Sequence, residues 1–162
     1  MTGGGNQRQR ILLVEDDLHL RNCFENLLEY DGHEVHSVDG GEAALVKLEQ
    51  EKFDLVLTDY LMPQMNGDEL ARLIKQRRPN LPVILASGSF QGTSTFQSST
   101  PGVDCLLNKP FSLAELREAI IWAIDLHADS GLTGPACLGL PSEDSEALKP
   151  SGHPPIGGNH FQ

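Results

Sequence analysis

Five short, largely apolar runs alternate along this chain with segments whose apolar residues recur every three or four positions. The runs are residues 11–14, 33–38, 53–59, 82–87 and 103–107. Runs of this length suit buried strands, and the longer periodicity between them suits amphipathic helices. Strands that alternate with helices build a parallel sheet with right-handed crossovers. We therefore predict an α/β fold with a doubly wound, five-stranded parallel sheet and helices on both faces.

Helical patterns follow four of the five runs. They begin after Asp17, at Gly41, near Asn66 and after Ser112, where Ser112 and Glu115 form a capping box. Residues 88–101 should hold a further helix, but they are mostly Gly, Ser and Thr. We expect only a frayed helix there.

Composition divides the chain into one domain and two tails. Residues 1–9 are Gly-rich and polar, and residues 128–162 are rich in Gly, Pro and Ser with few large apolar side chains. Such segments bury too little surface to offset the entropy of ordering them. We predict a folded domain over residues 10–127, flanked by a disordered N-terminus (1–9) and a disordered tail (128–162).

The charge balance and hydropathy exclude several classes of function. The formal net charge is −11, and the basic residues form no stripe of the kind that binds nucleic acid. No apolar run approaches the ~18 residues of a membrane span, and the N-terminus lacks a signal-peptide core. We expect a cytoplasmic protein without nucleic-acid or membrane partners. The six histidines show no metal-ligand spacing and are expected on the surface.

Polar residues follow the predicted strands where each strand ends. Glu15 and Asp16 follow the first run, Asp59 and Ser87 end the third and fourth, and Lys109 follows the fifth. Each of them alone is most simply a helix cap, a turn residue or a surface charge. Because the carboxyl ends of parallel strands meet at one crevice, however, we expect them to form one site.

These residue types favour phosphoryl transfer. Clustered carboxylates repel one another and call for a cation, and oxygen ligands suit Mg²⁺. Asp59 could attack a phosphoryl group to give an acyl phosphate. We expect Asp16 to bind the metal directly and Glu15 to bind it through water. We expect Lys109 to pair with the phosphoryl charge and Ser87 to donate a hydrogen bond.

The chain resembles the response-regulator receiver domain of two-component signalling over residues 10–127. The motifs that carry the resemblance are ILLVEDD, DLVLTDYLMPQMNG, LPVILASG and GVDCLLNKPF. The resemblance implies the flavodoxin-like strand order 2-1-3-4-5 and a cis bond between Lys109 and Pro110. It also implies these roles: Asp59 as phosphoacceptor, Glu15 and Asp16 as the acidic pair, the Leu61 backbone carbonyl as a metal ligand, Ser87 as the switch hydroxyl and Lys109 as the family lysine.

The sequence departs from the family at two places. Leu106 stands where receivers usually carry a Tyr or Phe that rotates during switching, and residues 88–101 are a weak helix. Both departures concern the surface through which receivers usually signal to their targets. Neither removes a residue of the phosphorylation site.

The resemblance implies a single-domain phosphoacceptor with Mg²⁺ as cofactor. It would take its phosphoryl group from phosphohistidine on a sensor histidine kinase or a histidine phosphotransfer protein, and would signal by contact with a downstream protein. It would assist its own aspartyl phosphorylation and dephosphorylation rather than act as an enzyme. Three alternatives stay open: a receiver module of a hybrid sensor kinase, a Mg²⁺-dependent phosphohydrolase with an Asp nucleophile, and a phosphorylation-independent binding module. Such hydrolases typically carry a second acid two residues after the nucleophile, where this chain has Leu61.

Overall fold

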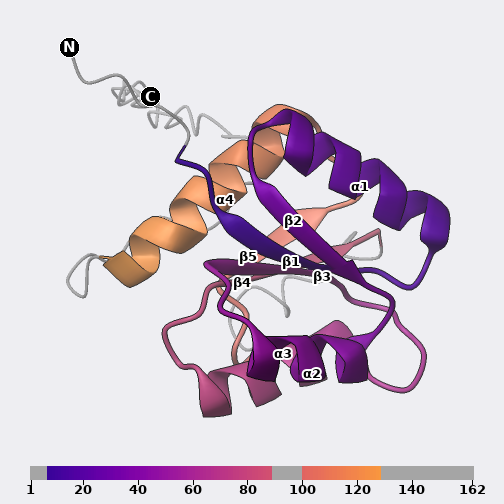
Figure 1. Cartoon of the computed structure of the whole chain (residues 1–162), viewed down its shortest axis with the longest axis vertical. Helices are drawn as coiled ribbons and strands as arrows, with labels where there is room; N and C mark the ends of the chain where they lie inside the picture. The colour runs from indigo at the N-terminus through magenta and orange to yellow at the C-terminus, as the bar shows by residue number, and fades with distance from the viewer. Residues whose placement is uncertain (1–6, 89–99, 129–162) are drawn as a thin grey trace, which may run out of the picture.

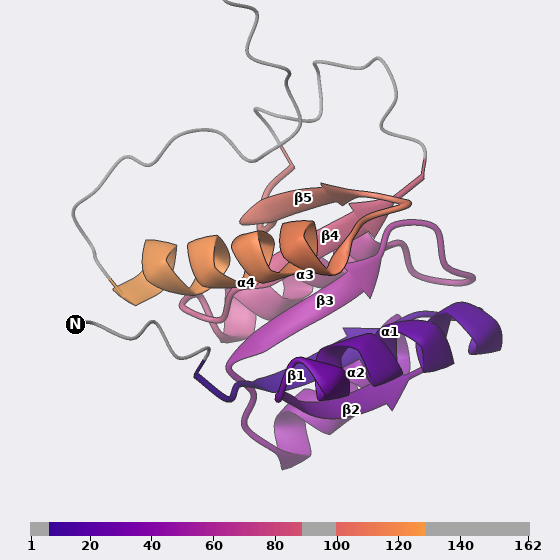
Figure 2. The same cartoon turned by 90° about the horizontal axis from the view of Figure 1, so that it is seen from above.

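A five-stranded parallel sheet forms the centre of the computed structural model, which describes residues 7–88 and 100–128. Its order is β2-β1-β3-β4-β5, as predicted, with β2 and β5 at the two edges (Figure 2). The strands are β1 (Arg10–Val14), β2 (Glu34–Val38), β3 (Leu55–Asp59), β4 (Val83–Ser87) and β5 (Cys105–Asn108). The helices are α1 (Leu18–Tyr30), α2 (Gly41–Gln50), α3 (Gly67–Arg77) and α4 (Leu113–Ala128).

Each face of the sheet carries its own hydrophobic core. Helices α1 and α4 cover one face, and α2 and α3 cover the other (Figure 1). Leu13 and Leu57 belong to the first core and Val14 and Val56 to the second, because successive side chains of a strand point to opposite faces. The predicted doubly wound architecture is therefore confirmed.

The capping box predicted at the start of the last helix is present. The Ser112 backbone N–H donates to Glu115 Oε2 at 2.7 Å, and the Glu115 N–H donates to Ser112 Oγ at 3.2 Å. The Lys109–Pro110 peptide bond is cis, as the resemblance implied. The frayed helix expected over 88–101 falls almost wholly on residues 89–99, outside the described residues, and so do most of the two predicted disordered ends.

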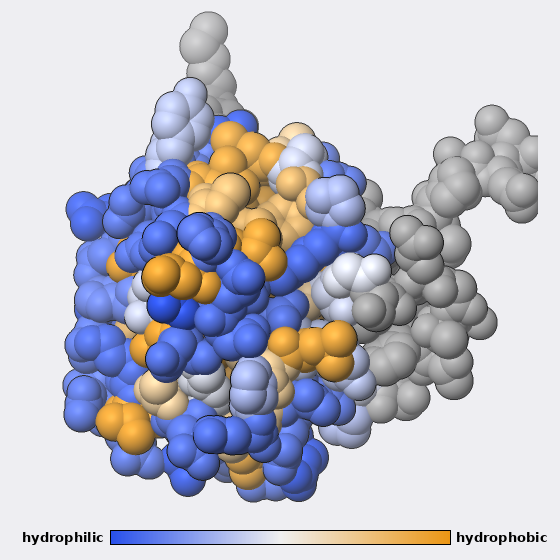
Figure 3. Space-filling view, turned by 90° about the vertical axis from the view of Figure 1, so that its right-hand side faces the viewer, coloured by the Kyte–Doolittle hydropathy of each residue, from blue (hydrophilic) through white to orange (hydrophobic). Residues whose placement is uncertain are grey.

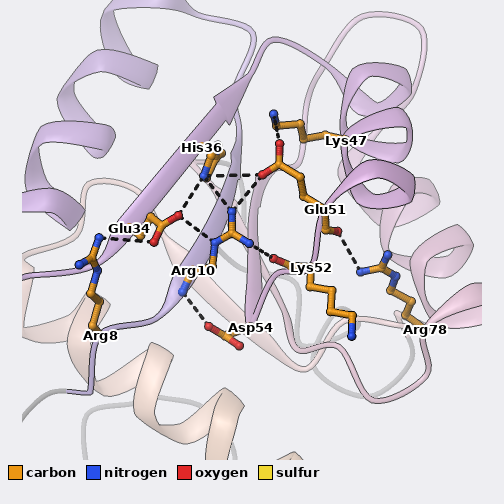
Figure 4. Close-up of polar contacts among 9 residues, drawn as sticks. All are labelled: Arg8, Arg10, Glu34, His36, Lys47, Glu51, Lys52, Asp54 and Arg78. Atoms are coloured by element: carbon orange, nitrogen blue, oxygen red, sulfur yellow. Dashed lines mark hydrogen bonds and ion pairs between the residues drawn. The ribbon is translucent and has the colours of Figure 1, made fainter.

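Polar side chains tie the strands together at the amino edge of the sheet, opposite the strand ends that carry Asp59 and Ser87. Arg10 lies at the centre of this network (Figure 4). Its guanidinium donates to Glu34 at 2.8 Å, to Glu51 at 3.0 Å and to the Lys52 carbonyl at 2.9 Å. The network therefore joins β1 to β2 and to the connection between α2 and β3.

The expectation that all six histidines lie on the surface is wrong for His33. Its side chain is only 1% exposed, with Nε2 3.5 Å from Asp31 Oδ2. Its Nδ1 accepts a hydrogen bond of 3.3 Å from the Gln9 N–H. A histidine whose two ring nitrogens find partners inside the fold can be buried, and nothing in the local sequence pattern specifies those partners.

Candidate functional site

The register of the sheet brings the predicted residues to one crevice at the carboxyl edge. Val14 pairs with Thr58, so Glu15 follows on β1 beside Asp59 at the end of β3. Ser87 pairs with Asn108, so Lys109 follows directly after β5. The backbone N–H of Lys109 donates to the Ser87 carbonyl at 2.9 Å, which holds the start of the lysine-bearing loop against β4.

Lys109 reaches across β4 to the two buried carboxylates. Its Nζ lies 2.6 Å from Glu15 Oε2 and 2.8 Å from Asp59 Oδ1. The side chains of Lys109, Glu15 and Asp59 are 15%, 3% and 12% exposed. Two strand spacings amount to roughly 10 Å, and only a long side chain can bridge that distance. This geometry agrees with the expectation that Lys109 and the strand-end carboxylates form one site.

Burial and pairing shift the ionisation of two of these groups. Burial raises the pKa of the Glu15 carboxyl, and the hydrogen bond from Lys109 opposes part of that rise. Burial alone would lower the pKa of the Lys109 ammonium, but its hydrogen bonds to Asp59 and Glu15 raise that pKa above its usual value. Lys109 therefore stays charged and neutralises part of the carboxylate cluster.

The acidic residues fit a small divalent cation. One carboxylate oxygen each from Glu15, Asp16 and Asp59 lies within 4.8 Å of the others. With Lys109 as the ammonium that contacts this cluster, a negative charge remains for a cation to balance. Asp16 is exposed while Glu15 is buried, so the cluster opens to solvent on one side. An all-oxygen, partly hydrated site of this kind suits Mg²⁺.

Asp17, the third acid after β1, caps helix α1 and is not part of the carboxylate cluster. Asp17 is the N-cap of α1, and its Oδ1 accepts from the His19 N–H at 2.8 Å and from the Leu20 N–H at 3.0 Å. Arg21, one turn into α1, donates from Nη1 to the Glu15 carbonyl at 2.8 Å. The cap and this bond fix the backbone that presents Glu15 and Asp16.

Backbone hydrogen bonds hold the loop after β3 before and after Leu61, whose carbonyl is the predicted metal ligand. The Tyr60 N–H donates to the Ala86 carbonyl at 2.9 Å, and the Gly67 N–H donates to the Tyr60 carbonyl at 2.8 Å. Leu61 lies on this loop two residues after Asp59, and its side chain is 58% exposed. The role of its carbonyl remains a prediction.

Ser87 and Leu106 share one face of the sheet. Ser87 is 2% exposed at the end of β4, and Leu106 pairs with Leu85 two residues earlier on that strand. Residues two apart on a strand point to the same face. Leu106 is therefore a diagonal neighbour of Ser87, with an aliphatic side chain at the position that the family usually fills with an aromatic ring.

Two aromatic residues near Lys109 were missed as members of the site. The rings of Phe24 on α1 and Phe111 stack with centroids 4.9 Å apart, and Lys109 Nζ lies 5.2 Å from the centroid of Phe24. The helical spacing of Phe24 indicated only a core position. The motif NKPF, which places Phe111 two residues after Lys109, was the available signal.

Comparisons with known proteins agree with this geometry. The family model described as "Response regulator receiver domain" matches residues 11–121. The response regulator receiver protein CpdR of Brucella abortus is 38% identical over 108 residues, which cover 67% of this chain and 90% of CpdR. The response regulator protein FleR of Pseudomonas aeruginosa is 39% identical over 111 residues, which cover 68% of this chain but 24% of FleR.

Solved structures show the same fold. A CheY-like receiver domain protein from Methanospirillum hungatei is 30% identical with a TM-score of 0.68, covering 77% of this chain and 100% of that one. The receiver domain of sensor histidine kinase PA1611 from Pseudomonas aeruginosa is 28% identical with a TM-score of 0.66, covering 73% and 98%. That structure holds a magnesium ion coordinated in its active-site cleft.

Proposed function

Because this chain belongs to the response regulator receiver domain family of two-component systems, we propose that Asp59 accepts a phosphoryl group from phosphohistidine. The donor is a sensor histidine kinase or a histidine phosphotransfer protein, and the phosphorylated domain signals through contact with a protein target. The cytoplasmic location and the absence of a nucleic-acid partner, both expected from the sequence, are parts of this proposal. None of the helices in the described part of the chain has both the length and the hydropathy of a membrane-spanning segment.

The observation that carries the proposal is the pairing of Lys109 with both Asp59 and Glu15 inside a buried, acidic crevice. An Asp59 oxygen attacks phosphorus, the new O–P bond forms, and the N–P bond to the donor histidine breaks with its electron pair returning to the imidazole nitrogen. Lys109 then exchanges its bond to Asp59 for the phosphoryl oxygens, and Ser87 donates a hydrogen bond to them.

The metal would be held by Glu15, Asp16, Asp59 and the Leu61 carbonyl. When bound, Mg²⁺ would supply positive charge to the phosphoryl oxygens. The exposed position of Asp16 leaves room for the water ligands that Mg²⁺ retains. Glu15, which is buried beside Lys109, would act through one of those waters.

Exposed apolar residues beside the crevice support contact with a protein donor. Leu18 at the start of α1 is 56% exposed, and Leu61 after β3 is 58% exposed. Figure 3 shows hydrophobic residues as separate patches among hydrophilic ones on the face at the carboxyl ends of the strands. Apolar patches with polar rims are typical of protein contact sites.

A receiver module within a larger signalling protein is the second candidate. The chain matches 8% of the length of Histidine kinase P4 of Formosa agariphila at 32% identity, and 46% of the length of several transcriptional regulators. In such a protein the same chemistry at Asp59 would control a different output. The phosphohydrolase alternative is less favourable because Leu61 supplies no second carboxylate.

Incubation with acetyl phosphate and Mg²⁺, followed by intact mass measurement, tests the proposal. We expect one added phosphate on the wild type and none on Asp59→Asn. The matched control is Asp17→Asn, which keeps a capping side chain on α1 and should label like the wild type. Labelling of Asp59→Asn would contradict the assignment. Repeated turnover of a phosphoester by the wild type would favour the hydrolase instead.

A further inference from the structure

One contact of Lys109 lies outside the acidic crevice. The Phe24 ring faces the ammonium, with Nζ 5.2 Å from the ring centroid. A cation within about 6 Å of a ring centroid is attracted by the negative face of the ring. Lys109 is thus held by two carboxylates on one side and by an aromatic face on another.

The ring is itself held in place. Phe111 stacks on it at an interplanar angle of 25°, and both rings pack against the core shared by α1 and α4. Phe111 follows Lys109 by two residues, so the stack joins α1 to the loop that carries the lysine. The two half-buried rings hold each other against the core, so the face of Phe24 can stay in place when the lysine moves.

The carboxylate contacts must change during the reaction, whereas the ring contact need not. When Asp59 becomes an acyl phosphate, one of its oxygens is esterified and Lys109 must turn toward the new phosphoryl oxygens. We propose that Phe24 is a positioning residue, whose ring face keeps the Lys109 ammonium directed at the crevice while its carboxylate partners are exchanged. This inference rests on the phosphoacceptor function proposed above.

Phe24→Leu is the central variant, because it removes the ring but keeps an apolar side chain of similar reach. We expect its labelling rate with acetyl phosphate and Mg²⁺ to fall by about threefold to tenfold, since one desolvated cation–π contact is lost. Phe24→Tyr keeps a ring face and should label close to the wild-type rate. Leu27→Val on the same helix and against the same core is the control for lost packing.

A second readout needs neither metal nor phosphate. The Lys109 ε-methylene protons of the wild type should be shifted upfield in the NMR spectrum by the ring current of Phe24. The shift should persist in Phe24→Tyr and Leu27→Val and vanish in Phe24→Leu. If Phe24→Leu does not fold, a trifluorinated phenylalanine at position 24 keeps the shape of the ring and weakens its negative face, and should slow labelling in the same direction.

Two results would overturn the inference. One is a Phe24→Leu protein that labels at the wild-type rate, and the other is a loss of rate no greater than that of Leu27→Val. Failure of the wild type to take up phosphate would instead refute the proposed function, while the NMR comparison would still decide whether the ring contacts the lysine.

Discussion

Lys109 forms ion pairs with two carboxylates of the site. One ammonium contacts the carboxylates of Glu15 and Asp59, and the Glu15 side chain is only 3% exposed. Removing one partner of a buried ion pair leaves the other charge uncompensated and is strongly destabilising. The lysine therefore contributes to the folded state before any phosphoryl group arrives, and a loss of activity in a Lys109 variant must be separated from a loss of folding.

Gly67 is required by the close approach of the loop to the end of β3. A Cβ at this position would lie 2.1 Å from the Asp59 carbonyl oxygen and 2.5 Å from Leu85 Cδ1. We predict that Gly67→Ala lowers the free energy of unfolding by about 1–3 kcal/mol, the usual cost of overpacking a core. Denaturant unfolding measures the change.

Gly40 supplies the matched control for this substitution. A Cβ at Gly40 meets no atom within 4 Å, and its extended backbone accepts any residue. Gly40 is the N-cap of α2, where alanine is less favourable than glycine, so Gly40→Ala should lower the unfolding free energy by about 0.5–1 kcal/mol, less than Gly67→Ala. Equal effects of the two substitutions would show that the contact with Asp59 is unimportant.

His33 should make stability depend on pH. Burial lowers the pKa of its imidazole, while Asp31 favours the charged form and Arg117 of α4 opposes it. A group whose folded pKa lies below the unfolded value of about 6.5 binds protons more readily in the unfolded state. The contribution of neutral His33 to the free energy of unfolding is therefore complete above pH 6.5, and it is lost as the pH falls toward the folded pKa.

Unfolding free energies measured from pH 8 to pH 5 check this sign. The wild type should lose stability below pH 6.5, and His33→Asn should lose less over the same interval. The slopes of unfolding free energy against pH should differ between the two proteins by at most about 1.4 kcal/mol per pH unit, the limit for one proton. A wild-type protein that gains stability between pH 6.5 and pH 5, relative to His33→Asn, would contradict the assignment.

Hydrophobic periodicity predicted the strands and helices, and the polar residues at the strand ends predicted the composition of the crevice. The strands at the centre of the sheet are largely apolar runs that end at, or one residue before, a polar side chain, so their position along the chain follows from the sequence. Their order in the sheet came from the family resemblance. The boundaries were less certain, since β5 begins at Cys105 rather than at the predicted residue 103. A terminal residue differs from its neighbours by one or two hydrogen bonds, which local composition does not specify.

Contacts between elements were the part that the sequence could not predict. The burial of His33 depends on Gln9 and Asp31, and the place of Phe24 depends on Phe111, which is far away in the chain. Helical spacing gives the face of a helix on which a residue lies, but not the partner from another element. The chemical roles assigned from the sequence to the site residues stay predictions: Glu15, Asp16, Asp59, Leu61, Ser87 and Lys109.

The amino edge of the sheet offers a test of how separate elements are joined. Arg10 binds Glu34 of β2, Glu51 after α2 and the Lys52 carbonyl (Figure 4). Its Cζ also lies 5.5 Å from the centroid of the Phe53 ring. Because these contacts hold three parts of the chain together, we predict that Arg10→Ala lowers the denaturation midpoint.

Arg8 is the matched control for Arg10. The Arg8 side chain is 71% exposed, and its Nη2 lies 3.4 Å from Oε2 of the same Glu34. Exposed ion pairs contribute little to stability, so Arg8→Ala should leave the midpoint close to that of the wild type. Thermal or denaturant unfolding of both variants at two salt concentrations makes the comparison. A larger loss in Arg8→Ala than in Arg10→Ala would refute the role of the network.

The carboxyl and amino ends of the strands carry different kinds of polar cluster. The carboxyl edge gathers carboxylates that repel one another, with Lys109 as their counter-charge. The amino edge gathers paired side chains of opposite sign around Arg10. The two helical layers between them bury apolar residues on both faces. The stability contributed by the two cores and by the Arg10 network can therefore offset the electrostatic cost of the carboxylate cluster.

The buried residues of α4 mark the C-terminal limit of the predicted folded domain. Leu116, Ala119, Ile120 and Ala123 are the buried residues of α4, and all of them precede Ala128. We expect a chain that ends at Ala128 to keep its unfolding free energy within about 0.5 kcal/mol and to label on Asp59 at the wild-type rate. A chain that ends at Ile121 loses the fully buried Ala123 together with Trp122 and Ile124, which pack against the core, and should be less stable by about 2 kcal/mol or more. Intact mass after acetyl phosphate treatment and denaturant unfolding of the three chains decide the matter. A marked loss in the chain ending at Ala128 would show that residues 129–162 belong to the folded unit, against the domain boundary predicted from composition.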